Sequence, residues 1–255
     1  MGLSKYATLI GLLLAANPLT TGAEAQGNSS KAPPTAITAK GLNWYAVLLA
    51  GSDEHPVFDR FVTDFQKTLK DGGVSATAYK AEGAPVEGQP GGSFNPRNLL
   101  AKAPSGEQSA CLLYVTSHGN PEGFVEYVKD PRNLGILTAG DLAVMADQVC
   151  GERPAAIVIS ACFGASMVTQ SLRKPNRVIL AAARPDRSSF GCSFEETYNY
   201  FDGCILQNWS DSATWTVLFD RAKECISRRE GPRRDASEPQ IFVGSAAKNL
   251  PVPHP

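Results

Sequence analysis

The chain of 255 residues has few of the features that mark metal sites or nucleic-acid binding. It holds three histidines, His55, His118 and His254, and none of its six cysteines lies in a CxxC pair, so the ligand spacings typical of zinc sites are absent. Its 24 Lys and Arg residues are balanced by 25 Asp and Glu residues, which argues against a nucleic-acid-binding surface. We predict no metal, no cofactor and no nucleic-acid partner.

Long apolar runs are missing after residue 25, so no later segment is expected to cross a bilayer. The first 25 residues differ: Lys5 precedes an uncharged stretch from Tyr6 to Leu19, and small residues follow at Ala23 and Ala25. This order is typical of a signal peptide, residues 1–25. We expect a secreted or periplasmic protein without stable membrane insertion after cleavage, with an uncleaved anchor as the alternative.

Export would place the six cysteines in a compartment where disulfides persist. Cys204 and Cys225 fall in two consecutive predicted helices, about residues 194–209 and 212–229, joined by the short turn NWSDS. Facing positions of such a helix pair can meet, so we predict a disulfide between them. Cys111 lies inside an apolar strand run and is predicted to be an inert buried thiol.

Residues 26–43 are small, polar and proline-bearing, which predicts a flexible linker. Apolar runs and amphipathic segments then alternate: a strand WYAVLLAG, a helix within PVFDRFVTDFQKTLKDGG, and a weaker strand VSATAY. A long loop, AEGAPVEGQPGGSFNP, leads to a short helix near Leu99. The pattern up to this point is that of a β-α unit.

Three further runs, at residues 110–116, 155–160 and 177–183, are apolar at nearly every position, as in parallel strands covered on both faces by helices. A hairpin through GFVEYV and LGIL and a helix beginning near Thr138 separate the first two. A short helix capped by Ser166 is predicted between the others. A weak strand QIFVG follows the last helices, and residues 245–255 are predicted to be a tail.

Two of these strands end at a reactive residue, His118 in YVTSHG and Cys162 in IVISACFG. Functional groups collect beyond the carboxyl ends of strands in parallel α/β sheets, and neighbouring strands are about 5 Å apart. A Cys/His pair is the minimum for nucleophilic acyl transfer. Gly119 has no side chain, so its N–H group could approach and stabilise an oxyanion.

The two motifs, in this order, resemble the legumain-like branch of the caspase-type cysteine peptidases. WYAVLLAGSD resembles the first strand and turn of that family, and AAARPDRSSFGC resembles the segment in which a Ser-Ser pair lines the specificity pocket. The resemblance covers roughly residues 44–244 and is nearest to compact exported bacterial members. It implies an α/β fold, a three-layer α/β/α caspase-like sandwich with a mostly parallel central sheet.

The resemblance also implies site roles and a peptide or protein substrate. Cys162 would be the nucleophile and His118 the proton donor to the leaving amine. The N–H groups of Gly119 and Cys162 would form the oxyanion hole. The same site could instead transfer the acyl group to an amine, as a transpeptidase, or the chain could be an inactive binding module. Retention of both His118 and Cys162 argues against the inactive module, and the absence of a GxSxG elbow argues against an esterase.

By position in the resemblance, Arg60, Ser189 and Asp202 should line the specificity pocket. An arginine donates and a carboxylate accepts, which suits the amide of an asparagine before the scissile bond. Phe163 stands where legumains usually carry an acidic residue after the nucleophile. We therefore expect a weakened asparagine preference, with aspartate more competitive. His55, in the loop after the first strand, is a lesser candidate at the same edge.

Overall fold

The computed structural model describes residues 41–81, 108–130 and 133–253. The predicted signal peptide, nearly all of the predicted linker, most of the glycine-rich loop, the short helix near Leu99 and His254 lie outside the described residues. Among the residues that are described, no helix combines the length and apolar character that a membrane span requires.

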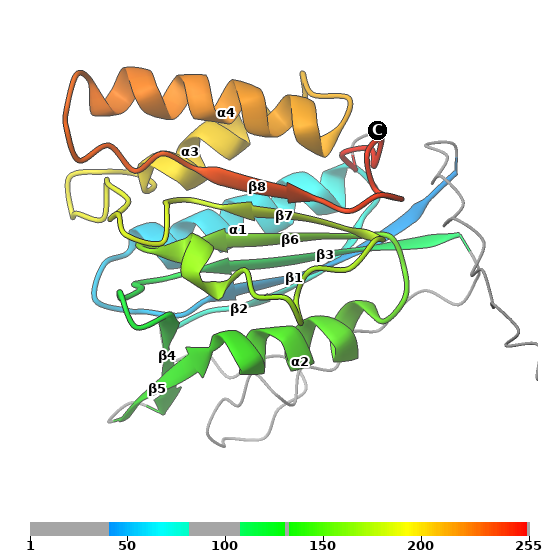
Figure 1. The fold of residues 1–255 in the computed structure, drawn as a ribbon, viewed down its shortest axis with the longest axis horizontal. Helices are drawn as coiled ribbons and strands as arrows, with labels where there is room; N and C mark the ends of the chain where they lie inside the picture. The colour runs from blue at the N-terminus through cyan, green and yellow to red at the C-terminus, as the bar shows by residue number, and fades with distance from the viewer. Residues whose placement is uncertain (1–40, 82–107, 131–132, 254–255) are drawn as a thin grey trace, which may run out of the picture. The chain divides into compact units, whose positions relative to one another are not determined.

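A six-stranded sheet with the order β2-β1-β3-β6-β7-β8 forms the centre of the fold (Figure 1). Its strands are β1 (Asn43–Ala50), β2 (Ser75–Tyr79), β3 (Ser109–Thr116), β6 (Ala155–Ser160), β7 (Arg177–Ala181) and β8 (Gln240–Val243). Every neighbouring pair is parallel except β7 and β8, which are antiparallel. All residues of β3, β6 and β7 are buried, as the continuous apolar runs predict.

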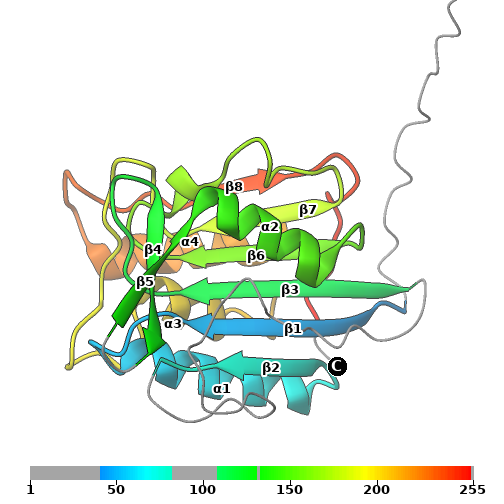
Figure 2. The same ribbon diagram turned by 90° about the horizontal axis from the view of Figure 1, so that it is seen from below.

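Helices cover both faces of this sheet (Figures 1 and 2). One face carries α1 (Val57–Asp71), α3 (Tyr200–Gln207) and α4 (Trp215–Glu230), and the other carries α2 (Ala139–Cys150). Successive strand residues therefore enter different cores: Leu48 packs in the core that holds Phe61 of α1, and Leu49 in the core that holds Met145 of α2. The three-layer α/β/α sandwich with a mostly parallel sheet is confirmed.

Local sequence explains where the long helices begin and end. The apolar residues of α1 recur at helical spacing and are all buried, and its C-terminus meets Gly72 and Gly73, the latter with φ of 80°. Thr138 caps α2 through a reciprocal capping box with Asp141. The predicted hairpin is present as β4 (Phe124–Asp130) and β5 (Asn133–Thr138), paired antiparallel.

Two predicted helices differ from the structure. Between β6 and β7 there is a single 3-10 turn, η2 (Gly164–Met167), and the Ser166 hydroxyl donates to the Phe163 carbonyl instead of capping a helix. The residues after η2 include the β-branched Val168 and Thr169, which are poor helix formers. Helix α3 begins at Tyr200, not near residue 194, because the Asn199 side chain caps it there.

The C-terminal segment packs on the core, so the prediction of a tail is wrong for residues 245–253. Ala247, Leu250 and Val252 are buried in the same core as Trp215. The backbone N–H group of Trp215 donates to the Leu250 carbonyl, and the backbone N–H group of Val252 donates to the Ala213 carbonyl. Prolines interrupt the sequence pattern there, but the apolar side chains between them still fill the core.

Two disulfides brace the fold. Cys204 of α3 bonds Cys225 of α4, as predicted. Cys111 of β3 bonds Cys150 at the end of α2, with Cα atoms 5.4 Å apart, so the prediction that Cys111 is a free buried thiol is wrong. An apolar strand run predicts the burial of Cys111, but only the packing of α2 on β3 brings Cys150 to it. Cys162 and Cys192 are free thiols.

Candidate active site

His118 and Cys162 lie at the same end of two neighbouring strands. β3 and β6 pair in parallel with Thr116 opposite Ser160, and the Ser117 N–H group extends the ladder to the Ser160 carbonyl. His118 and Cys162 each follow two residues beyond that last pair. These strands are sheet neighbours, so the two side chains start from matched positions at the carboxyl edge of the sheet.

The Cys162 sulfur is half-buried and held by the loop after β7. The Ser189 N–H group donates to Sγ at 3.3 Å, and Sγ lies 3.6 Å from both the hydroxyl and the carbonyl oxygen of Ser189. Of the three residues predicted to line a specificity pocket, Ser189 is thus in direct contact with the candidate nucleophile.

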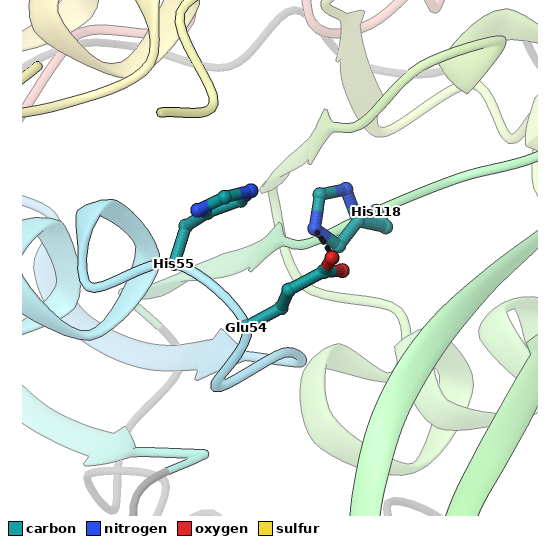
Figure 3. Close-up of side chains that lie close together, drawn as sticks. All are labelled: Glu54, His55 and His118. Carbon is teal, nitrogen blue, oxygen red and sulfur yellow. Dashed lines mark ion pairs between the residues drawn. The ribbon is translucent and has the colours of Figure 1, made fainter. Parts of the chain in front are cut away.

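His118 lies between a carboxylate, a second imidazole and a phenyl ring. Its Nε2 atom is 3.2 Å from Oε2 of Glu54, an ion-pair distance without hydrogen-bond alignment (Figure 3). The His55 ring is 5.7 Å away, centroid to centroid, and the buried Phe58 ring packs edge-on at 5.1 Å. With Nε2 directed at Glu54, Nδ1 is the ring nitrogen left for a substrate.

Two of the three histidines meet in space, although the sequence suggested no ligand cluster. His55 and Glu54 belong to the turn after β1, and β1 is the parallel neighbour of β3, whose end carries His118. Ligand atoms of Glu54, His55 and His118 all lie within 4.8 Å of one another. The available signal was that both histidines follow apolar strand runs, which places them at one edge of a parallel sheet.

Gly119 packs tightly against the residue that carries the sulfur. A Cβ atom at this position would come closer than 3.0 Å to the Cys162 carbonyl oxygen. Backbone hydrogen bonds to β4 lie on either side of Gly119. The His118 carbonyl accepts from the Glu126 N–H group, and the Asn120 N–H group donates to the Phe124 carbonyl. Within the described residues, neither the Gly119 nor the Cys162 N–H group donates to a protein acceptor. Two backbone donors are thus available, one on Cys162 itself and one on Gly119, which packs against it.

Asp202 lies beneath the site and not at its surface. Its side chain is fully buried, and its carboxylate accepts hydrogen bonds from the Tyr114 hydroxyl at 2.6 Å, the Thr116 hydroxyl at 2.6 Å and the Asn199 amide at 2.7 Å. The Asn199 amide also contacts the Ser160 hydroxyl at 3.3 Å. Burial raises the pKa of Asp202 to about 6, against the opposing effect of these hydrogen bonds.

The Asp202 network therefore joins Thr116 of β3 to Ser160 of β6, each two residues before a candidate catalytic side chain. The structure does not bring Asp202 to a surface that a substrate could touch, which corrects its assignment to a pocket wall. A buried carboxylate and a pocket carboxylate have the same sequence signature, so only the packing separates them.

Arg60 projects from α1 toward the loop before α3. It is exposed and donates to the backbone carbonyl oxygens of Glu196 and Thr197 at 3.2 and 3.1 Å. The structure thus separates the three predicted pocket residues: Ser189 contacts Cys162, Asp202 is internal, and Arg60 holds a loop. No sequence signal distinguished these three environments.

A cavity of about 390 Å³ lies beside Phe163, the residue that follows the candidate nucleophile. Its lining includes Phe163, Arg187 and Phe190 together with the carboxylates of Asp186 and Asp235. Phe163 has a left-handed backbone, with φ of 57°, and its N–H group donates to the Arg187 carbonyl at 2.7 Å. The residue that follows the nucleophile is thus part of a cavity wall that offers both donors and acceptors.

Comparison with known proteins identifies the class of protein. The model of the peptidase C13 family matches residues 101–230, just over half of the chain, so the protein belongs to the peptidase C13 family. Among solved structures, the chain is similar to the Drosophila initiator caspase Dronc, at 9% identity and a TM-score of 0.46 over 94% of both chains. No curated protein matches the sequence significantly.

Proposed function

We propose that the protein is an endopeptidase that cleaves peptide bonds through Cys162 and His118. The observation that carries the proposal is their matched placement beyond Thr116 and Ser160, at the ends of adjacent parallel strands. The N–H groups of Gly119 and Cys162 have no protein acceptor among the described residues. Membership of the peptidase C13 family supports the reaction class.

In the proposed reaction, the deprotonated Cys162 sulfur attacks the scissile carbonyl carbon. The carbonyl oxygen becomes an oxyanion that the N–H groups of Gly119 and Cys162 stabilise. Protonated His118 gives a proton to the amine as the C–N bond breaks, which leaves a thioester on Cys162. A water molecule then loses a proton to His118, attacks the thioester and releases the acid, and the thiolate is restored.

Glu54 serves as a positioning residue in this scheme. Its carboxylate lies on the Nε2 edge of His118 and keeps Nδ1 available for the leaving amine. The Glu54 side chain is 67% exposed, so solvent screens its charge and weakens the attraction between Glu54 and His118.

For specificity, we propose asparagine or aspartate before the scissile bond, bound in the cavity beside Phe163. Arg187 is a donor, and Asp186 and Asp235 are acceptors, so the cavity holds the opposite partners that a primary amide needs. All three side chains also bond within the protein, to Arg234, Arg184 and Arg233 respectively. The apolar side chain of Phe163 stands where legumains usually carry an acidic residue. This supports faster cleavage after aspartate, relative to asparagine, than in a legumain. We further propose that the protein is exported after cleavage at Ala25, which N-terminal sequencing of the secreted or periplasmic protein would test.

The central test uses purified protein and peptides that differ only in Asn, Asp, Lys or Arg before the scissile bond. Cys162→Ala should abolish cleavage and His118→Ala should lower it by several orders of magnitude, whereas Cys192→Ala, the matched free thiol, should retain it. Cleavage by Cys162→Ala would refute the assignment. Mass spectrometry of the products with an added amine separates hydrolysis from transpeptidation, and a strong Lys or Arg preference would refute the proposed pocket.

A further inference from the structure

The cluster of Glu54, His55 and His118 has the dimensions of a metal site. The 3.2 Å between Nε2 of His118 and Oε2 of Glu54 is close to the about 3.4 Å that separates two ligands of a tetrahedral zinc with bonds of about 2.1 Å. All three ligand atoms lie within 4.8 Å of one another, so small side-chain rotations bring them to one ion (Figure 3).

The surroundings of the cluster hold the imidazoles in place. Phe194 packs edge-on against His55 at 4.8 Å, and Phe58 packs edge-on against His118 at 5.1 Å. Within the described part of the chain, the Nδ1 atom of His55 is buried without a hydrogen-bond partner. A buried polar atom without a partner costs free energy, which metal coordination would recover.

The donor set selects the class of ion. Two imidazoles suit zinc, copper, nickel and iron, whereas magnesium and calcium prefer oxygen ligands. Two histidines and one glutamate leave a fourth tetrahedral position open, and the Glu54 side chain is 67% exposed, so solvent reaches the cluster.

We propose that Glu54, His55 and His118 bind a divalent transition-metal ion, with zinc as the reference ion, and that the bound ion inhibits the peptidase. Inhibition follows because coordination through Nε2 uses the one free electron pair of the neutral His118 ring, so Nδ1 carries the hydrogen and cannot accept the proton that the proposed reaction delivers to it. This second part depends on the proposed function, whereas the binding site itself does not.

Binding is tested on Cys162→Ala, which has neither the nucleophile thiol nor peptidase activity. Competition with a chromophoric chelator should show one equivalent of Zn²⁺ bound, and the absorption of bound Co²⁺ should report nitrogen and oxygen ligands. Adding Glu54→Gln or His55→Asn should weaken Zn²⁺ at least tenfold, whereas adding His254→Asn should not. No bound Zn²⁺, or affinity unchanged by both cluster substitutions, would overturn the site. Mg²⁺ should not compete.

Inhibition is tested on the chain with Cys162 intact. Zn²⁺ should reduce peptide cleavage and EDTA should restore it. Each chain is compared with its own metal-free rate, and His55→Asn should need at least tenfold more Zn²⁺ than the unsubstituted chain for the same fractional inhibition. Equal inhibition of His55→Asn would show that zinc acts through Cys162 and His118 alone and would overturn the proposal. A chain without any cleavage activity would refute the proposed function, while the binding experiment would still decide the site.

Discussion

Replacement of Asp202 by asparagine should change how stability depends on pH. Burial raises the pKa of this carboxyl group from the ordinary 3.8 to about 6, so the folded state holds its proton more tightly than the unfolded state. Between these two values the folded chain binds more protons, and its free energy of unfolding falls as pH rises. The difference between the two pKa values corresponds to about 3 kcal/mol in the free energy of unfolding. The folded state is less stable by this amount above pH 6 than below pH 3.8.

Asp202→Asn keeps the shape of the side chain but cannot ionise. It loses one acceptor toward Tyr114, Thr116 or Asn199, which shifts its stability by a nearly constant amount. We therefore expect the unfolding free energy of Asp202→Asn, relative to that of the unsubstituted chain, to rise by about 2.5 kcal/mol between pH 4 and pH 7.5.

Urea unfolding at several pH values measures this difference, and other titrating groups cancel because both chains share them. Asp220→Asn, on the exposed side of α4, makes the same chemical change at the surface and is the matched control. A flat difference for Asp202→Asn, or one that falls as pH rises, would refute the assignment of a buried carboxylate with a raised pKa.

Three further predictions concern cysteines and one glycine. Iodoacetamide at pH 7 should label Cys162 and spare Cys192, because burial raises the pKa of the Cys192 thiol to about 12; equal labelling by peptide mapping would contradict this. Replacing Cys111 and Cys150 together by alanine should lower the free energy of unfolding by about 4 kcal/mol, since their bond closes a loop of 39 residues, and a loss below about 1 kcal/mol in urea would argue against that bond. Gly119→Ala should reduce peptide cleavage at least tenfold with unchanged far-UV circular dichroism, because its Cβ would press on the Cys162 carbonyl oxygen; full activity would remove the need for a glycine there.

Local patterns predicted most of the fold. Continuous apolar runs identified β3, β6 and β7, and the helical spacing of apolar residues identified α1. These signals are local because burial on one or both faces repeats with the period of the element. The packing of residues 245–253 and the bond between Cys111 and Cys150 depend on contacts between distant segments, which no local pattern contains.

The candidate site shows the same division. Strand ends at His118 and Cys162 could be found from sequence because parallel strands present their carboxyl ends at one edge. The interior position of Asp202 could not, because its environment is made by Tyr114, Thr116 and Asn199 from separate elements. The His55 and His118 pair was accessible in principle once β1 and β3 were taken as neighbours.

The two disulfides also bear on the chemical state of the candidate nucleophile. A thiolate can attack a disulfide and take the place of one of its sulfurs, so a chain with both free thiols and bridges can exchange them. Cys111, Cys150 and Cys204 are fully inaccessible and Cys225 nearly so, and Cys162 can reach them only if the sheet and its helices separate locally. The packing on the two faces of the sheet thus keeps the Cys162 thiolate away from both disulfides. The rate at which Cys162 exchanges with them is set by local opening of the fold.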